Sequence, residues 1–135
     1  MNAADPVRPR ARILVVEDDP EAAFYAVHVL TTMGHFEVVH TRDPADALQR
    51  ASSEPWDLVL TDLDMPGMTG LELLRALRRT VPALPVAVIT AHVTIGATAA
   101  ELRKSADAFL EKPVPAARLV AVAAALIARA ARSSA

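Results

Sequence analysis

The sequence predicts an α/β protein built on one five-stranded parallel sheet with helices on both faces. Five short apolar runs alternate along the chain with segments of helical spacing, which is the βα order of such folds. Most of these runs are β-branched and lack polar alternation, as expected for strands that are covered on both faces. The predicted strands are ILVV (13–16), FEVV (36–39), LVL (58–60), VAVI (86–89) and AFL (108–110). Right-handed crossovers would connect each strand to the next.

Helix start signals stand between these strands. Asp19-Pro20 and Asp43-Pro44 each combine an N-cap residue with proline at the first helical position. Thr69 followed by Glu72 fits a capping box, and leucines at helical spacing come after it. Pro115 is predicted to start the last helix, which carries another apolar stripe.

The fourth helix is the weakest of the set. Its segment, VTIGATAAELRK (93–104), contains Thr94, Gly96 and Thr98, which are poor helix formers. We therefore expect this helix to be mobile.

Composition restricts the possible functions. The chain has 135 residues, 53% of them hydrophobic, which suits one domain with a real core. A net charge of −2 provides no electrostatic footprint for nucleic acid, so we expect no DNA binding. There is no cysteine, which excludes disulfides, a thiol nucleophile and a cysteine metal site. That composition suits a reducing compartment, and we expect a cytoplasmic protein.

The ends of the chain differ in composition from its middle. Residues 1–11 lack the apolar core of a signal peptide and are expected to form a flexible arm. The apolar run LVAVAAALIA (119–128) is too short to cross a bilayer, so no membrane insertion is expected. The folded domain is predicted at 12–131, followed by a tail at 132–135.

Polar side chains collect at the carboxyl ends of four predicted strands. Glu17 and Asp18 follow the first strand, and the remaining ends carry Asp62, Asp64, Thr90 and Lys112. The second strand ends in HTRD, to which we assign no role. Taken alone, Asp62 is equally compatible with a turn. However, ligands of open parallel sheets bind beyond the carboxyl ends of the strands, where these residues would meet.

Crowded carboxylates repel one another, and a hard cation such as Mg²⁺ relieves that repulsion. We expect Asp18 and Asp62 to be direct ligands of Mg²⁺ and Glu17 to act through water. A carboxylate can also accept a phosphoryl group as an aspartyl phosphate. Lys112 is one of only two lysines beside twelve arginines, and its compact ammonium suits a narrow phosphoryl site. The Thr90 hydroxyl could donate a further hydrogen bond.

The motifs ILVVEDDP, LVLTDLDMPGMTG, VAVITA and FLEKPV strongly resemble the receiver domain of bacterial two-component response regulators, over about residues 11–131. The resemblance implies a flavodoxin-like (βα)₅ fold with strand order 2-1-3-4-5. It implies that Asp62 is the phospho-acceptor and that Glu17 and Asp18 are the acidic pair of the Mg²⁺ site. Asp64 falls where this family provides a backbone carbonyl to the metal.

The resemblance also implies a switch and partners. Thr90 matches the switch hydroxyl, Lys112 the family's lysine, and Phe109 the switch aromatic. The phosphoryl donor would be a histidine kinase or a histidine phosphotransfer protein, and the output would be a downstream protein target. No enzyme activity is implied beyond self-catalysed phosphotransfer and autodephosphorylation. The protein would be a monomer, or a weak dimer through the fourth helix, fifth strand and fifth helix.

Two other interpretations fit parts of the sequence. The DLDMP stretch loosely resembles the opening motif of haloacid-dehalogenase-type phosphatases, but Pro66 stands where those enzymes have Thr or Val. Their second acid pair also comes late in the chain, whereas Glu17 and Asp18 come first. A degenerate receiver that acts only as a scaffold is a third interpretation, and the complete set of site residues argues against it. One departure from the family is Ser105, where glycine is common.

Overall fold

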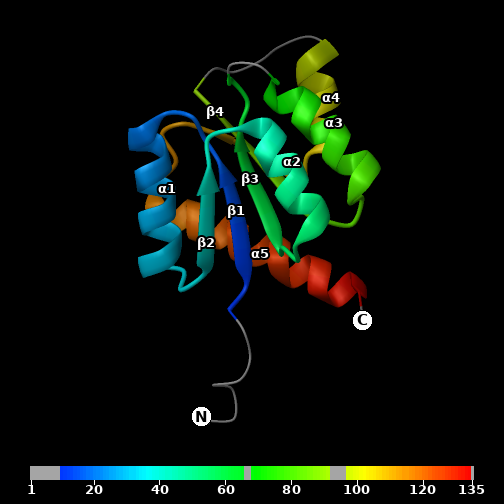
Figure 1. Cartoon of the computed structure of the whole chain (residues 1–135). Coiled ribbons are helices and arrows are strands. Elements are labelled where there is room, and N and C mark those ends of the chain that lie inside the picture. The colour runs from blue at the N-terminus through cyan, green and yellow to red at the C-terminus, as the bar shows by residue number, and fades with distance from the viewer. Residues whose placement is uncertain (1–9, 66–67, 92–96, 135) are drawn as a thin grey trace.

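The computed structural model describes residues 10–65, 68–91 and 97–134, which form a five-stranded sheet between two layers of helices (Figure 1). All paired strands are parallel, and their order is β2-β1-β3-β4-β5, as predicted. The strands are β1 (Arg12–Val16), β2 (Glu37–Thr41), β3 (Leu58–Asp62), β4 (Val86–Thr90) and β5 (Ala108–Glu111). The helices are α1 (Pro20–Thr32), α2 (Pro44–Ser53), α3 (Gly70–Thr80), α4 (Ala97–Ser105) and α5 (Ala116–Ser134).

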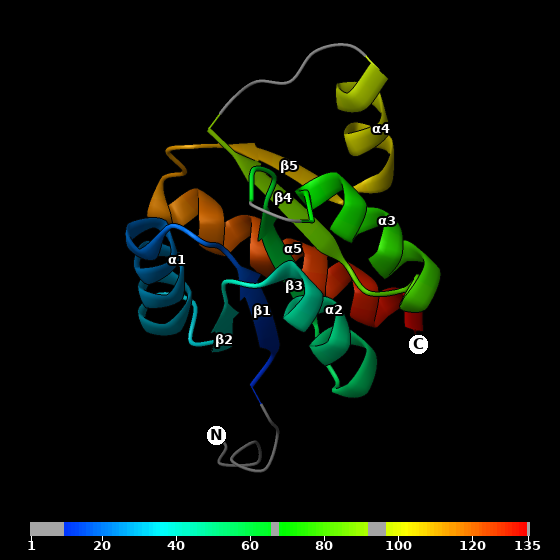
Figure 2. The same cartoon turned by 45° about the horizontal axis from the view of Figure 1, so that its top comes forward.

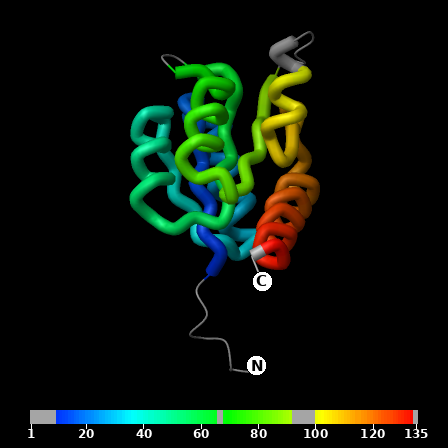
Figure 3. Tube along the Cα trace, turned by 90° about the vertical axis from the view of Figure 1, so that its right-hand side faces the viewer, coloured from blue at the N-terminus to red at the C-terminus, as the bar shows by residue number. Residues whose placement is uncertain are grey.

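Two apolar clusters, one on each face of the sheet, form the core. In β1, Ile13 and Val15 pack against α1 and α5, whereas Leu14 and Val16 pack toward α2 and α3. The side view places α5 on one side of the sheet and α2 and α3 on the other (Figure 3). Successive side chains of a strand point to opposite faces. Both faces are buried here, which explains why the strand sequences lack polar alternation.

The predicted helix caps at three strand–helix junctions are confirmed. Asp19 and Asp43 accept hydrogen bonds from Ala22 N at 3.2 Å and Ala45 N at 3.0 Å. In the capping box, Glu72 N donates to the Thr69 hydroxyl at 3.2 Å, and Thr69 N donates to the Glu72 carboxylate at 2.9 Å. The caps of α1 and α2 start these helices a few residues after β1 and β2 end, so those two loops are short, whereas residues 63–69 separate β3 from α3.

Some boundaries differ from the sequence prediction. The strand predicted at 36–39 lies at Glu37–Thr41, because it pairs with β1 from Arg12↔Glu37 to Val16↔Thr41. The last helix begins at Ala116, not at Pro115, whose carbonyl instead accepts a hydrogen bond from Leu119 N at 3.0 Å. The alanine-rich helix then continues to Ser134, so residues 132–134 are helical where a tail was expected.

Three expectations fall partly or wholly outside the described residues. Residues 1–9 of the predicted arm are not described, nor are residues 92–96, which include Thr94 and Gly96 of the predicted fourth helix. That helix is described from Ala97, and its expected mobility stays a prediction. Pro66 is also outside the described residues. Within the described part of the chain, every helix is too short or too polar to span a membrane.

Candidate functional site

The sheet brings Glu17, Asp18 and Asp62 together at its carboxyl edge, which is tilted toward the viewer in Figure 2. Strands β1 and β3 are neighbours in register Val16↔Thr61, so the residues that follow Val16 lie beside Asp62. One carboxylate oxygen from each of the three acids lies within 4.8 Å of the others. Glu17 and Asp62 are buried and Asp18 is half-buried. The predicted acidic cluster therefore forms, and its oxygen donors are those that a hard divalent cation requires.

Lys112 reaches this cluster from β5, two strands away from β3. Its Nζ donates to Glu17 Oε1 at 2.8 Å and lies 3.5 Å from Asp62 Oδ2. The backbone N–H of Lys112 donates to the Thr90 carbonyl at 2.7 Å, which holds the end of β5 against β4. The ammonium thus lies between two buried carboxylates.

Burial and like charge disturb the protonation of this cluster. Burial raises the pKa of Glu17 and the Asp62 charge raises it further, while the hydrogen bonds from Lys112 and Asp19 lower it. Burial acts to lower the pKa of Lys112, but the Glu17 hydrogen bond and the charges of Asp62 and Glu17 outweigh it, so that pKa is raised. The three carboxylates therefore carry more negative charge than the Lys112 ammonium neutralises, and a bound cation would reduce the repulsion between them.

Thr90 and Phe109 lie on one face of the sheet. Thr90 is fully buried at the end of β4, and Val88, two residues earlier, pairs with Phe109 of β5. Phe109 is half-buried and packs at the margin of the cluster on the α2–α3 side. The guanidinium of Arg103, from α4, lies 5.3 Å from the centre of the Phe109 ring. A threonine and an aromatic side chain thus lie on the same face of two neighbouring strands, and the aromatic ring contacts α4.

The Asp64 side chain is not part of the cluster of three acids. Its side chain is exposed, and its backbone N–H faces Asp62 Oδ1 at 3.4 Å. The α3 helix starts nearby at Gly70, where an added Cβ would lie 2.6 Å from the Leu63 Cα. Glycine is therefore required where the loop after β3 folds back against the strand end.

Comparison with known proteins identifies the family. The model of the response regulator receiver domain matches residues 13–124. The chain belongs to this family. The transcriptional regulatory protein PrrA of Mycobacterium tuberculosis is 36% identical over 118 residues, which are 87% of this chain and 50% of that protein. The transcriptional regulatory protein GlrR of Escherichia coli is 35% identical over 104 residues, 77% of this chain and 23% of GlrR. The chain therefore spans at most half the length of these relatives.

Solved receiver domains share its architecture. The signal receiver domain of a putative LuxO repressor protein from Vibrio parahaemolyticus superposes with a TM-score of 0.84 at 28% identity, covering 93% of this chain and 95% of that one. A CheY-like receiver domain protein from Methanospirillum hungatei gives a TM-score of 0.85 at 24% identity, covering 92% and 98%. The flavodoxin-like fold is confirmed, and the chain is a receiver domain of the two-component signalling type.

Two contacts of this receiver domain were missed from the sequence. His40 Nε2 lies 2.7 Å from the Glu17 carbonyl oxygen, and the Tyr25 hydroxyl donates to the Val114 carbonyl at 2.7 Å. Tyr25 also lines a largely apolar cavity of about 680 Å³ that extends from Glu17 and Lys112 to α1 and the start of α5. No sequence signal marks Tyr25. His40 could have been noticed because it stands at the end of a strand, as the other site residues do.

Proposed function

We propose that this receiver domain takes a phosphoryl group onto Asp62 with Mg²⁺ held by Glu17, Asp18 and Asp62. The observation that carries the proposal is the cluster of three carboxylates within 4.8 Å, with Lys112 Nζ at 2.8 Å from Glu17 and 3.5 Å from Asp62. Glu17 would act through water, and the Asp64 backbone carbonyl would complete the protein ligands. The family membership supports the same assignment.

The transfer would be a displacement at phosphorus. An oxygen of ionised Asp62 attacks the phosphoryl group, an O–P bond forms, and the P–N bond to a donor histidine breaks. The electron pair of that bond stays on the imidazole, which takes a proton from solvent. Lys112 would bind the phosphoryl oxygens and Thr90 would donate a hydrogen bond to them. Mg²⁺, when bound, would balance charge on the same oxygens. Later attack by water would return Asp62 and inorganic phosphate.

The signal would then pass through Thr90 and Phe109. Movement of the Thr90 hydroxyl toward the phosphoryl group would leave space on the face that it shares with Phe109. Inward rotation of that ring would change the surface formed by α4, β5 and α5. Phosphorylation would shift a pre-existing equilibrium between the two arrangements, as ligands generally do.

We further propose the setting of this domain. The donor would be a histidine kinase or a histidine phosphotransfer protein, and the output a protein target, with residues 12–131 acting as the receiver. Self-catalysed phosphotransfer and autodephosphorylation would be its only chemistry. The domain would be cytoplasmic, would bind no DNA by itself, and would be monomeric or weakly dimeric through α4, β5 and α5. The near-neutral charge balance supports the absence of DNA binding.

The test is incubation with acetyl phosphate and Mg²⁺, followed by intact mass measurement over time. We expect one added phosphoryl group, its loss on standing as the acyl phosphate hydrolyses, and none after Mg²⁺ is chelated. Asp62→Asn should accept none, whereas the matched control Asp64→Asn should accept one. A phosphoryl group on Asp64 would overturn the assignment, and a wild-type protein that accepts none would be a scaffold.

A further inference from the structure

We propose that His40 is a positioning residue for the acidic pair, because its ring N–H holds the peptide that joins Glu17 to Asp18. This inference rests on the proposed metal-binding role of Glu17 and Asp18. His40 itself touches neither the phosphoryl group nor the metal. It acts through the backbone of β1, from the strand end to which the sequence assigned no chemistry.

Residues of β2 bind both the backbone N–H and the backbone carbonyl of Glu17. Strands β1 and β2 pair in register Val15↔His40 and Val16↔Thr41. One residue beyond the paired strands, Glu17 N donates to the Thr41 carbonyl at 3.1 Å. The Glu17 carbonyl then meets His40 Nε2 at 2.7 Å. Two consecutive residues of the edge strand thus bind both polar backbone groups of one acid.

The contact defines the tautomer of His40. A carbonyl oxygen only accepts hydrogen bonds, so the short distance requires a hydrogen on Nε2. A neutral His40 must therefore carry its proton on Nε2 and not on Nδ1. The His40 side chain is exposed, yet its Nε2 is hydrogen-bonded to the backbone carbonyl of Glu17.

The position of this carbonyl decides what the hydrogen bond does. This carbonyl belongs to the planar peptide unit that joins Glu17 to Asp18. Because the unit is rigid, fixing the direction of the carbonyl also fixes the Asp18 N and Cα, from which the Asp18 side chain projects. The Glu17 side chain is already held, because Oε2 accepts from Asp19 N at 3.1 Å and Oε1 from Lys112 at 2.8 Å. His40 adds control of the following residue. It therefore keeps the Asp18 carboxylate beside Glu17 and Asp62 before a cation arrives.

The experiment is a titration with Mg²⁺ alone of the wild-type protein and three variants, with thermal melting of each in the absence of metal. His40→Leu removes the donor, His40→Gln keeps an N–H donor of similar reach, and His28→Leu is the matched control. His28 lies on α1, where it stacks on Phe24 at 5.7 Å and faces a different element. We expect His40→Leu to bind Mg²⁺ about tenfold more weakly, as expected for loss of a group that orients a metal ligand. His40→Gln should recover most of the affinity, and His28→Leu should match the wild type.

Each outcome separates the possible causes. A purely structural role would lower the melting temperature of the metal-free His40→Leu protein and leave its Mg²⁺ dissociation constant unchanged, which would overturn the proposal. Equal Mg²⁺ binding by wild type and His40→Leu would do the same while leaving the proposed function intact. A wild-type protein that binds no Mg²⁺ would refute the metal site itself, and this inference with it.

A measurement on the unmodified protein keeps the inference testable if His40→Leu does not fold. Nitrogen-15 NMR distinguishes the two neutral tautomers of histidine. We expect His40 to carry its proton on Nε2, with a coupling across the hydrogen bond to the Glu17 carbonyl. A proton on Nδ1 would contradict the proposal.

Discussion

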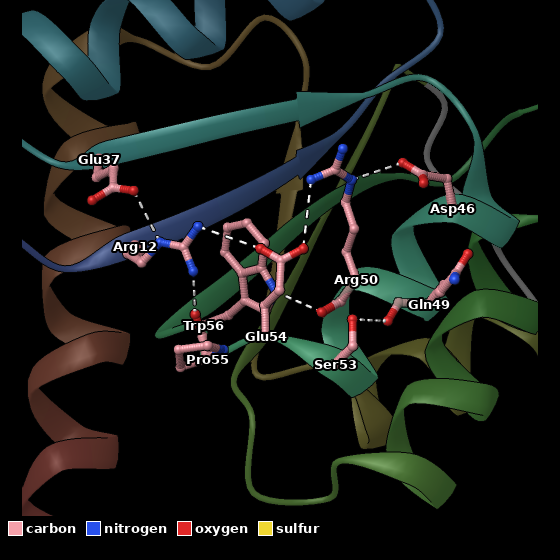
Figure 4. Close-up of polar contacts among 9 residues, drawn as sticks. All are labelled: Arg12, Glu37, Asp46, Gln49, Arg50, Ser53, Glu54, Pro55 and Trp56. Carbon is pink, nitrogen blue, oxygen red and sulfur yellow. Dashed lines mark hydrogen bonds and ion pairs between the residues drawn. The ribbon is translucent and has the colours of Figure 1, made fainter.

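The two ends of the central sheet handle charge in opposite ways. At the carboxyl end, Glu17, Asp18 and Asp62 converge and Lys112 is the cation that pairs with two of them. At the amino end, Arg12 is surrounded by acceptors and an aromatic ring (Figure 4). Both ends belong to the same strands and the same two cores. In this receiver domain, like charges gather at the carboxyl end, and stabilising contacts between segments gather at the amino end.

Arg12 connects several segments at the amino end. Its side chain donates to Glu37 at 3.0 Å and to the Pro55 carbonyl at 2.8 Å, and its guanidinium lies 4.2 Å from the centre of the Trp56 ring. Its backbone N–H donates to the Asp57 carboxylate at 2.7 Å. Opposite charges are paired here. The carboxyl end, by contrast, gathers three carboxylates around one ammonium, and either a proton or a bound cation would relieve their repulsion.

The largest expected effect comes from the change of Asp to Asn, made in separate variants at the two ends of β3. Asp62→Asn should abolish phosphoryl acceptance and raise the free energy of unfolding of the metal-free protein by about 1–2 kcal/mol, because a buried like charge is removed. Asp57→Asn, just before the same strand, should lower that free energy by about 0.5–1 kcal/mol and leave phosphorylation unchanged. Urea denaturation with EDTA and intact mass measure the two properties. If Asp62→Asn were less stable than the wild type, repulsion between Asp62 and the acids Glu17 and Asp18 would not destabilise the metal-free protein.

Arg12→Ala tests the amino end directly. Loss of the Trp56 contact and of the hydrogen bonds to Glu37 and Pro55 should lower the free energy of unfolding by about 1–2 kcal/mol. The side chain is partly exposed, so its ion pairs contribute only a small part of this. Urea denaturation provides the value, with Arg118→Ala on the exposed surface of α5 as the control. If Arg12→Ala left the free energy of unfolding unchanged but altered phosphorylation, the two ends of the sheet would not have the separate roles described above.

A smaller effect is expected where Arg103 covers Phe109. If this contact holds the unphosphorylated arrangement, Arg103→Gln should populate the switched state more. A cation–π contact at an exposed site is worth about 0.5–1 kcal/mol, so the apparent dissociation constant of beryllofluoride should fall by about two- to fivefold. Lys104→Gln, next to it on α4, is the matched control for charge. Weaker beryllofluoride binding by Arg103→Gln would show that the contact favours the switched state instead.

The smallest effect concerns the capping box of α3. The hydrogen bond from the Thr69 backbone, together with that from its side chain, lowers the pKa of Glu72 below its ordinary value. The folded state therefore binds this proton less tightly than the unfolded state does, and the associated stability is lost as pH falls through the folded-state pKa. Between pH 5 and pH 3, roughly around the ordinary carboxyl pKa, the melting temperature of wild type should fall slightly more than that of Glu72→Gln. Glu21→Gln, in the first turn of α1, should follow the wild type.

The sequence by itself determined the fold class and which acids meet at the carboxyl edge of the sheet. Apolar runs without alternation predicted strands buried on both faces, and Pro20, Pro44 and Thr69 predicted where helices start. Because parallel strands end at a common edge, the acids after the first and third runs could be expected to meet there. These inferences depend on residue type and spacing along the chain, which a single sequence contains.

Only the tertiary structure decided which residues from different elements contact one another. The bond from His40 to Glu17, the bond from Tyr25 to Val114 and the contact of Arg103 with Phe109 each join different elements. The pairing of Arg12 with Glu37 and Trp56 is of the same kind. Such contacts arise from strand register and from the direction of side chains across a packed core. No local pattern encodes them, since each partner is an ordinary residue until the sheet brings the two together.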